Sequence, residues 1–202
     1  MACGPPEAPT AAAITGLILA GGRGQRMGGV DKGLQAWRGL PLVDHALARL
    51  APQVREVMIS ANRNAALYGA RTARVLADAA DDFAGPLAGI LAGLRAARTP
   101  WLAVVPCDSP QLPSDLVARL AQGIAAARGA VVQRDHGAAG LRLEPVCCLL
   151  STALADDLAR YLAEGGRKVE GWVSRHAAPV LFGEPDDAAA FANVNTLADL
   201  QG

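Results

Sequence analysis

Residues 14–24 read Ile-Thr-Gly-Leu-Ile-Leu-Ala-Gly-Gly-Arg-Gly, an apolar run that passes directly into a glycine-rich turn. A short apolar run bounded by turn residues is consistent with a buried strand. In open α/β sheets, ligands bind beyond the carboxyl ends of the strands. This stretch therefore predicts the first strand of an α/β sheet, with a ligand held at its end.

The remaining sequence alternates short β-branched runs with longer amphipathic segments rich in Ala and Leu, a pattern typical of parallel strands joined by helices. Strands are predicted at Ile14–Leu19, Val57–Ala61, Arg74–Leu76, Trp101–Val105, Ala130–Gln133, Pro145–Leu150 and Pro179–Phe182. Helices are predicted at Val43–Leu50, Pro86–Ala97, Ser114–Ala127, Thr152–Ala163 and Lys168–Ser174. Together they predict a three-layer αβα sandwich with a mostly parallel sheet.

Helix boundaries carry local signals. Asp44 can cap the first helix, and Pro86 suits the first turn of the second, because a proline there gives up no hydrogen bond. Ser114 with Asp115 suits the start of the third helix. These signals agree with the predicted alternation of strands and helices.

Length and composition are typical of a folded single domain. The 202 residues are 51% hydrophobic and 19% charged, which excludes an intrinsically disordered chain. The sequence has no internal repeat and no long linker, so we expect one domain over residues 14–202 behind a flexible leader over residues 1–13. The part after Gly129 is expected to extend the sheet with mixed or antiparallel strands.

Charge and cysteine content limit the partners of this chain. Nineteen basic and nineteen acidic residues give a formal net charge of +0, so we expect no nucleic acid and no membrane as partners. The four cysteines show no metal-binding spacing, and adjacent Cys147 and Cys148 should point to opposite faces of a strand. We recognise no secretory signal and no apolar run long enough to span a membrane, so a soluble protein of the reducing cytoplasm is expected.

The glycine-rich turn has the composition of a phosphate-binding loop. Glycines allow backbone N–H groups to approach phosphate oxygens, and Arg23, Arg26 and Lys32 add positive charge to the same loop. The glycines alone fit a plain turn with solvated arginines equally well, whereas the three cations and Asp31 favour a nucleoside triphosphate. Spacing excludes two commoner loops, because Met27 replaces the third glycine of the dinucleotide fingerprint and Lys32 is not placed as in a Walker A loop.

The longer stretch Leu19-Ala-Gly-Gly-Arg-Gly-Gln-Arg-Met-Gly-Gly-Val-Asp-Lys-Gly-Leu34 closely resembles the signature loop of the molybdenum cofactor guanylyltransferases. Related nucleotidyltransferases share a looser glycine-rich loop, and the double glycine followed by Val-Asp-Lys-Gly favours the guanylyl branch. The resemblance extends in several elements from Ile14 to Leu200. It implies a Rossmann-like sandwich of the nucleotide-diphospho-sugar transferase type, whose N-terminal half binds GTP and whose C-terminal half binds molybdopterin.

A second candidate position is Asp108, which ends the apolar run Trp101-Leu-Ala-Val-Val-Pro-Cys107. A strand-end carboxylate can hold Mg²⁺, a hard ion that takes one or two carboxylates together with substrate phosphates, although a plain turn residue would look the same. The resemblance favours the metal, because the family has a Pro-Cys-Asp-x-Pro element here whose Asp holds Mg²⁺ and contacts the nucleotide. Cys107 itself is expected to be a buried apolar residue without chemistry.

The resemblance also implies direct nucleotide contacts in the glycine-rich turn and in a later loop. These contacts are Leu19, Ala20, Gly21, Gly22 and Asp78. The turn over residues 85–89, Gly-Pro-Leu-Ala-Gly, matches a family turn that lines the guanine nucleotide site. Ser60 stands where the family usually has Asn. A hydroxyl offers fewer hydrogen-bonding groups to the edge of a base than an amide does, so a contact between the Ser60 side chain and the base is left open.

Near the C-terminus, Asn193 and Asn195 lie in Phe-Ala-Asn-Val-Asn-Thr, which resembles a family Asn-Val-Asn-Thr-Pro element. At positions i and i+2 of an extended segment both amides face one side and could reach a pterin or a phosphate, while turn-forming asparagines before a final helix are the alternative. Arg167 and Lys168 also match a family element and could face the pterin phosphate. Glu144 stands where the family commonly has His, and its role is open.

The implied reaction is attack by the terminal phosphate of Mo-molybdopterin on the α-phosphorus of GTP, which forms the guanine dinucleotide cofactor and releases pyrophosphate. Arg26 and Lys32 are the expected catalytic cations and Asp108 the metal ligand, and no general base is required because the attacking phosphate is already ionised. The alternatives are a cytidylyltransferase or another small-molecule nucleotidyltransferase on the same fold, and a non-catalytic nucleotide-binding regulator. We expect a monomer that works with molybdoenzyme-maturation proteins.

Overall fold

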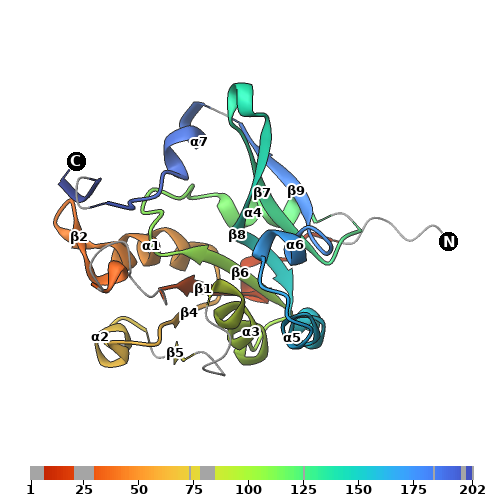
Figure 1. The fold of residues 1–202 in the computed structure, drawn as a ribbon, viewed down its shortest axis with the longest axis horizontal. Coiled ribbons are helices and arrows are strands. Elements are labelled where there is room, and N and C mark those ends of the chain that lie inside the picture. The colour runs from red at the N-terminus through yellow and green to blue at the C-terminus, as the bar shows by residue number, and fades with distance from the viewer. Residues whose placement is uncertain are drawn as a thin grey trace.

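The computed structural model describes residues 7–20, 30–72, 74–77, 85–124, 126–183, 185–196 and 199–201. Within them, seven strands form one sheet in the order β5-β4-β1-β6-β8-β7-β9 (Figure 1). These strands are β1 (Ile14–Leu19), β4 (Glu56–Ser60), β5 (Val75–Leu76), β6 (Trp101–Pro106), β7 (Gly129–Asp135), β8 (Leu141–Ser151) and β9 (Ala178–Phe182). Helices pack on both faces of the sheet, so the predicted three-layer αβα architecture is confirmed.

The α-helices of the described residues are α1 (Leu42–Leu50), α2 (Ala65–Gly69), α3 (Pro86–Ala96), α4 (Leu116–Gln122), α5 (Ala155–Ala163), α6 (Val169–Val173) and α7 (Pro185–Ala190). The five predicted helices are among them. The one predicted over residues 114–127 is shorter, because α4 ends at Gln122 and Gly123, a poor helix former, follows it. The helices α2 and α7 and the hairpin of β2 (Ala36–Trp37) and β3 (Leu40–Pro41) were not predicted, since such short elements rarely leave a periodic pattern.

The predicted helix starts are only partly right. Pro86 occupies the first turn of α3 as predicted, and Asp115 directly precedes α4, although its side chain makes no capping hydrogen bond. The prediction that Asp44 caps α1 is wrong. The helix begins at Leu42, so Asp44 already lies inside the first turn, where it forms an ion pair with Arg71.

The sheet has a parallel part and an antiparallel part. In the parallel part β1 pairs with β4 and β6, so the carboxyl ends of these three strands lie at one edge of the sheet. In the other part β8 runs antiparallel to β6 and β7, and β9 is parallel to β7. The mixed extension expected after Gly129 is confirmed. At the other end of the chain, Ala11–Ala13 of the expected leader form a single 3-10 turn that leads into β1.

Two apolar clusters, one on each face of the sheet, form the core. Cys147 lies in one cluster and Cys148 in the other, as predicted for neighbours in a strand. Gly16 in β1 permits close packing, because a Cβ there would lie 2.8 Å from Leu50 in α1. Each fully buried Leu or Ile side chain contributes roughly 1.5–3 kcal/mol, so this core holds the strand ends firmly in place. No helix within the described residues is long and apolar enough to cross a membrane.

Candidate active site

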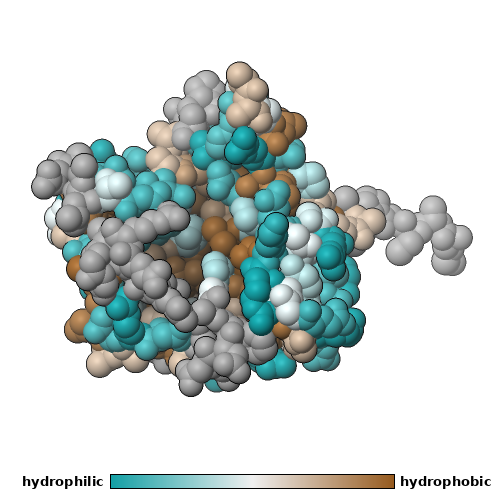
Figure 2. All heavy atoms as spheres, viewed as in Figure 1, coloured by the Kyte–Doolittle hydropathy of each residue, from teal (hydrophilic) through white to brown (hydrophobic). Residues whose placement is uncertain are grey.

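A pocket of about 280 Å³ opens at the edge of the sheet where β1, β4 and β6 end. Figure 2 shows a hollow with hydrophobic walls in the middle of the visible face. The walls of the pocket come from these strand ends, the start of α3, the middle of β8 and the segment after α7. The structure thus places a ligand-sized cavity where the first strand and its glycine-rich turn predicted one.

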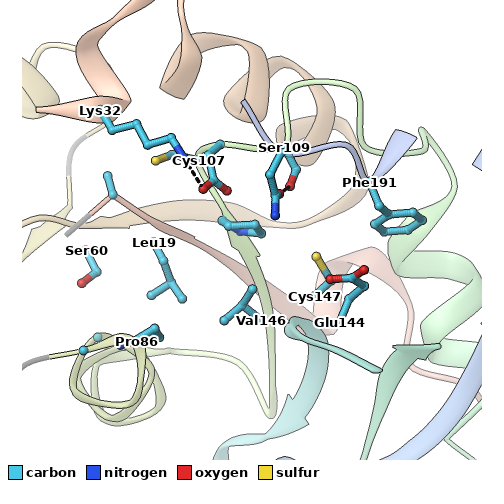
Figure 3. A pocket seen from close by; sticks show the side chains of 16 residues that line it. Leu19, Lys32, Ser60, Pro86, Cys107, Ser109, Glu144, Val146, Cys147 and Phe191 are labelled. Atoms are coloured by element: carbon cyan, nitrogen blue, oxygen red, sulfur yellow. Dashed lines mark hydrogen bonds and ion pairs between the residues drawn. The ribbon is translucent and has the colours of Figure 1, made fainter. Parts of the chain in front are cut away.

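Lys32 joins parts of the chain that are far apart in sequence. Its ammonium donates to Oδ2 of Asp108 over 2.7 Å and to Oδ1 of Asn195 over 2.8 Å. Figure 3 shows Lys32 reaching into the pocket, with a dashed line to the carboxylate. Both members of the ion pair are partly buried, which strengthens their attraction relative to water. We call Lys32, Asp108 and Asn195 the Lys32 node, where the predicted loop cation, metal ligand and C-terminal amide meet.

Asp31 holds the short 3-10 turn, Lys32–Leu34, that carries the lysine. Its carboxylate accepts hydrogen bonds from the Tyr68 hydroxyl over 2.6 Å and from the Asn64 amide over 2.9 Å. Burial, and then the hydrogen bond with Asp31, raise the pKa of Tyr68 far above its usual range, so the hydroxyl remains a donor. Gly33 leaves room for this contact, since a Cβ there would lie 2.5 Å from the hydroxyl oxygen. Asp31 therefore anchors the turn that carries the catalytic candidate.

Asn193 and Asn195 are held beside the end of β6 by their side-chain oxygens. Oδ1 of Asn193 accepts from the Ser109 hydroxyl over 2.7 Å, and Oδ1 of Asn195 accepts from Lys32. Asp199 also accepts from the backbone N–H of Asn195, and such backbone hydrogen bonds lower the pKa of Asp199. No described residue accepts from the NH₂ group of either asparagine, so both groups can donate to a ligand.

The other side of the pocket is formed by strand ends and by the start of α3. The backbone N–H of Ala20 donates to the carbonyl of Ser60, which joins the ends of β1 and β4. The Ser60 side chain is buried against α3, because a Cβ on Gly89 would lie 2.6 Å from its hydroxyl. Leu19 and Pro86 complete this wall. The lack of a side chain at Gly89 therefore lets α3 lie close to the strand ends.

The predicted site residues fall into three groups. Those that line the pocket are Leu19, Ala20, Lys32, Ser60, Asp108 and Asn193, with Asn195 joined to them through Lys32. Those that lie outside the described residues are Gly21, Gly22, Arg26 and Asp78. Arg167 and Lys168 do not line this pocket, and Arg167 instead donates to the backbone carbonyls of Leu162 and Gly166 at the end of α5.

Cys107 lies on the pocket wall as a buried thiol. Burial raises its pKa to about 12, and the negative charge of Asp108 adds to the shift. A thiol with this pKa keeps its proton at neutral pH, so it is not a nucleophile there. The buried, apolar role predicted for Cys107 is confirmed.

The chemistry of Asp108 suits a hard divalent cation. Its Oδ2 pairs with Lys32, while Oδ1 accepts no hydrogen bond from the residues that the structure describes. The same residues contain no group of three His, Cys, Asp or Glu side chains that could hold a metal by themselves. A single carboxylate fits an ion such as Mg²⁺, which keeps water ligands and takes others from substrate phosphates.

Several residues of the pocket wall were not predicted as site residues, among them Glu144 and Val146 from β8 and Phe191 after α7. Glu144 forms an ion pair with Arg134 of β7 over 3.2 Å. For Glu144 the sequence offers a local signal, a carboxylate directly before Pro145 and the apolar run over residues 145–150. The place of Glu144 and Val146 in the pocket depends on how β7 and β8 pair.

Comparison with known proteins identifies relatives that match most of the chain. The MobA-like NTP transferase domain family matches residues 16–180. The molybdenum cofactor guanylyltransferase of Ralstonia nicotianae is 54% identical over 195 residues, which cover 93% of this chain and 94% of that protein. The molybdenum cofactor guanylyltransferase of Acidovorax ebreus is 54% identical over 196 residues, which cover 93% of both chains.

Solved structures share the fold at lower identity. The molybdopterin-guanine dinucleotide biosynthesis protein A of Archaeoglobus fulgidus matches with a TM-score of 0.71 at 22% identity, over 93% of this chain and 95% of that one. The 4-diphosphocytidyl-2C-methyl-D-erythritol synthase of Anaerococcus prevotii matches with a TM-score of 0.71 at 10% identity, over 95% of this chain and 94% of that one. The chain therefore shares the fold of these two proteins.

Proposed function

Because the chain belongs to the MobA-like NTP transferase domain family, and within it to the molybdenum cofactor guanylyltransferases, we propose that it transfers GMP from GTP to Mo-molybdopterin. The products are molybdopterin guanine dinucleotide and pyrophosphate. The Lys32 node carries the proposal, since one ammonium contacts Asp108 and Asn195 over 2.7 and 2.8 Å. The node connects the end of the glycine-rich loop, which is expected to bind the triphosphate, with the C-terminal segment, which is expected to bind the second substrate.

In the proposed reaction the terminal phosphate of Mo-molybdopterin attacks the α-phosphorus of GTP. One P–O bond forms, and the bond between the α-phosphorus and the bridging oxygen of pyrophosphate breaks. An ionised phosphate needs no general base, so positioning and charge stabilisation carry the catalysis. Lys32, with Arg26 from the glycine-rich loop, neutralises charge on the α-phosphate and the leaving pyrophosphate. The NH₂ groups of Asn193 and Asn195 position the attacking phosphate.

The two halves of the domain have separate tasks in this proposal. The N-terminal half binds GTP through strand ends and turns, which include Leu19, Ala20, Gly21, Gly22, Ser60 and Asp78. The C-terminal half binds molybdopterin through Asn193 and Asn195. Asp108 would hold Mg²⁺, and the bound ion would supply further positive charge to the phosphates.

The cellular setting is also part of the proposal. Cys107, Cys147 and Cys148 are free thiols, which is consistent with the reducing cytoplasm. We propose a cytoplasmic monomer that hands its product to molybdoenzyme-maturation proteins. Sedimentation of the purified chain tests the monomer, and a stable dimer would contradict it.

Pyrophosphate release tests the proposed reaction. Each of the four ribonucleoside triphosphates is supplied with Mg²⁺, with and without molybdopterin. Of the four triphosphates, we expect only GTP to release pyrophosphate, and only when molybdopterin is present. Release from CTP instead would make the chain a cytidylyltransferase. Binding of GTP without release under any condition would indicate a nucleotide-binding regulator, and the proposal would fail.

A further inference from the structure

A bulge in β8 shapes one wall of the pocket. Val131 of β7 lies opposite Cys148, but its neighbour Val132 lies opposite Glu144, so three residues of β8 between these pairs have no partner on β7. Pro145, which has no backbone N–H to offer a ladder, lies in this bulge. Bulges beside functional sites re-aim side chains, and here Glu144 lines the pocket at the end of the bulge.

The Glu144 carboxylate is fixed at one oxygen and open at the other. Its Oε1 pairs with Arg134 over 3.2 Å and lies 3.8 Å from Nε2 of His136. No residue in the described part of the chain donates a hydrogen bond to Oε2. A partly buried carboxylate loses hydration, and N–H donors must replace the lost water if the charge is to stay stable. The open oxygen can therefore accept hydrogen bonds from a ligand that carries N–H donors.

The surroundings of Glu144 narrow the class of ligand. Figure 3 shows Glu144 grouped with Cys147 and Phe191, on the side of the pocket away from Ser60. These two neighbours present apolar surface to the pocket, which suits a flat ring. A carboxylate only accepts hydrogen bonds, and two adjacent N–H groups on one ring edge match it best. The 2-amino-4-oxopyrimidine part of a pterin has such an edge.

We propose that Glu144 recognises the 2-amino edge of the pterin ring, with Arg134 holding the carboxylate in position. This proposal rests on the proposed function, which brings a pterin phosphate into the pocket. The phosphate lies at the Lys32 node, and the ring extends along the wall toward Glu144. Guanine carries the same kind of edge, but its wall is the one formed by Ser60 and α3. Glu144 is therefore a specificity-determining residue for the second substrate.

The test measures binding of two fluorescent pteridine phosphomonoesters in the absence of GTP. One carries the 2-amino-4-oxo ring, and the other is its 2,4-dioxo analogue, in which a carbonyl replaces the amino group. The unmodified protein should prefer the 2-amino compound by roughly 10- to 100-fold, as expected for a hydrogen bond to a charged group. Glu144→Gln should abolish this preference, because a neutral amide replaces the anionic acceptor.

Glu56→Gln is the matched control. Glu56 also pairs with an arginine, Arg74, over 3.2 Å with similar exposure, but it does not line the pocket. This variant should keep the preference of the unmodified protein, and thermal unfolding establishes that both variants are folded. If Glu144→Gln does not fold, Glu144→Asp, which shortens the side chain by one methylene, must lower the preference instead.

Each remaining outcome decides the proposal. A preference unchanged in the folded Glu144 variant would make the residue a mere counter-ion of Arg134 and overturn the inference. A change in the discrimination of GTP from ITP would mean that Glu144 contacts guanine, which also overturns it. Absence of GMP transfer by the unmodified protein, together with intact pteridine discrimination, would instead overturn the proposed function alone.

Discussion

The parallel and antiparallel parts of the sheet contribute to the pocket in different ways. In the parallel part, β1, β4 and β6 end at one edge, and site residues such as Ser60 and Asp108 stand at or just after those ends. In the antiparallel part, Glu144 enters through a bulge within β8, and Asn193 arrives from a segment beyond the last strand. Parallel strands thus bring functional side chains together through their topology alone, whereas the side chains of the antiparallel part reach the pocket through individual tertiary contacts.

The largest effect should come from removing the carboxylate of the parallel part. Asp108→Asn should lower kcat by at least about 1000-fold, because the phosphates lose the charge that a bound metal supplies. Pyrophosphate release at saturating GTP and Mg²⁺ measures the loss, and circular dichroism should show an intact fold. Asp115→Asn, which changes an exposed carboxylate before α4, should retain normal turnover. Normal turnover of the Asp108 variant would contradict the assignment.

A smaller effect should follow from truncating the amides that accompany the antiparallel part. Asn193→Ala should raise the KM for molybdopterin roughly 10-fold and leave the KM for GTP unchanged, since one hydrogen bond to a charged phosphate is lost. Initial rates with each substrate varied in turn provide the measurement. Ser109→Ala removes only the donor that orients this amide, so its effect on the same KM should be smaller. An equal rise in the KM for GTP would show that Asn193 does not belong to a separate second-substrate wall.

A still smaller loss of activity is expected at Tyr68, whose hydroxyl orients Asp31 and so affects catalysis only through the position of the Lys32–Leu34 turn. Tyr68→Phe removes a buried hydroxyl that donates to Asp31, and should lower the free energy of unfolding by about 1–3 kcal/mol with a few-fold loss of kcat. Denaturant titration and turnover measure the two effects. Tyr161→Phe is the control, because among the described residues that hydroxyl donates to the carbonyl of Lys168 alone, in an exposed hydrogen bond. If both variants behave alike, Asp31 is not the anchor of the turn.

The smallest effect on activity is expected at Cys107. Cys107→Ala should leave turnover nearly unchanged, and alkylating reagents should not inhibit the unmodified protein near pH 8, because burial raises the pKa of the thiol to about 12. A folded-state pKa above the unfolded value of 9.0 means that stability is fully present below pH 9 and falls as the pH rises toward 12. Between pH 7 and pH 10 the free energy of unfolding should therefore fall less for Cys107→Ala than for the unmodified protein, and denaturant titration at the two pH values measures the difference. Rapid inactivation by alkylation of this thiol would refute the assignment.

Most of the fold was predictable because its signals are local. Apolar runs and their Gly and Pro boundaries indicated the seven strands of the large sheet and five of the seven α-helices that the structure describes. The helices α2 and α7 and the small hairpin were missed, because segments of so few residues rarely show a period. The proposed cap at Asp44 failed for another reason: its partner is Arg71, which lies 27 residues away and becomes a neighbour only in the folded chain.

The sequence by itself determined the first strand with its glycine-rich turn, the carboxylate at the end of β6 and the paired asparagines near the C-terminus, because each is a pattern of adjacent residues. Only the tertiary structure decided that Lys32 meets Asp108 across 76 residues and Asn195 across 163. It also decided that Asp31 anchors a turn and that Glu144 lines the pocket. The physical reason is that strand order and bulge register are set by packing over the whole chain, which no short stretch of sequence contains.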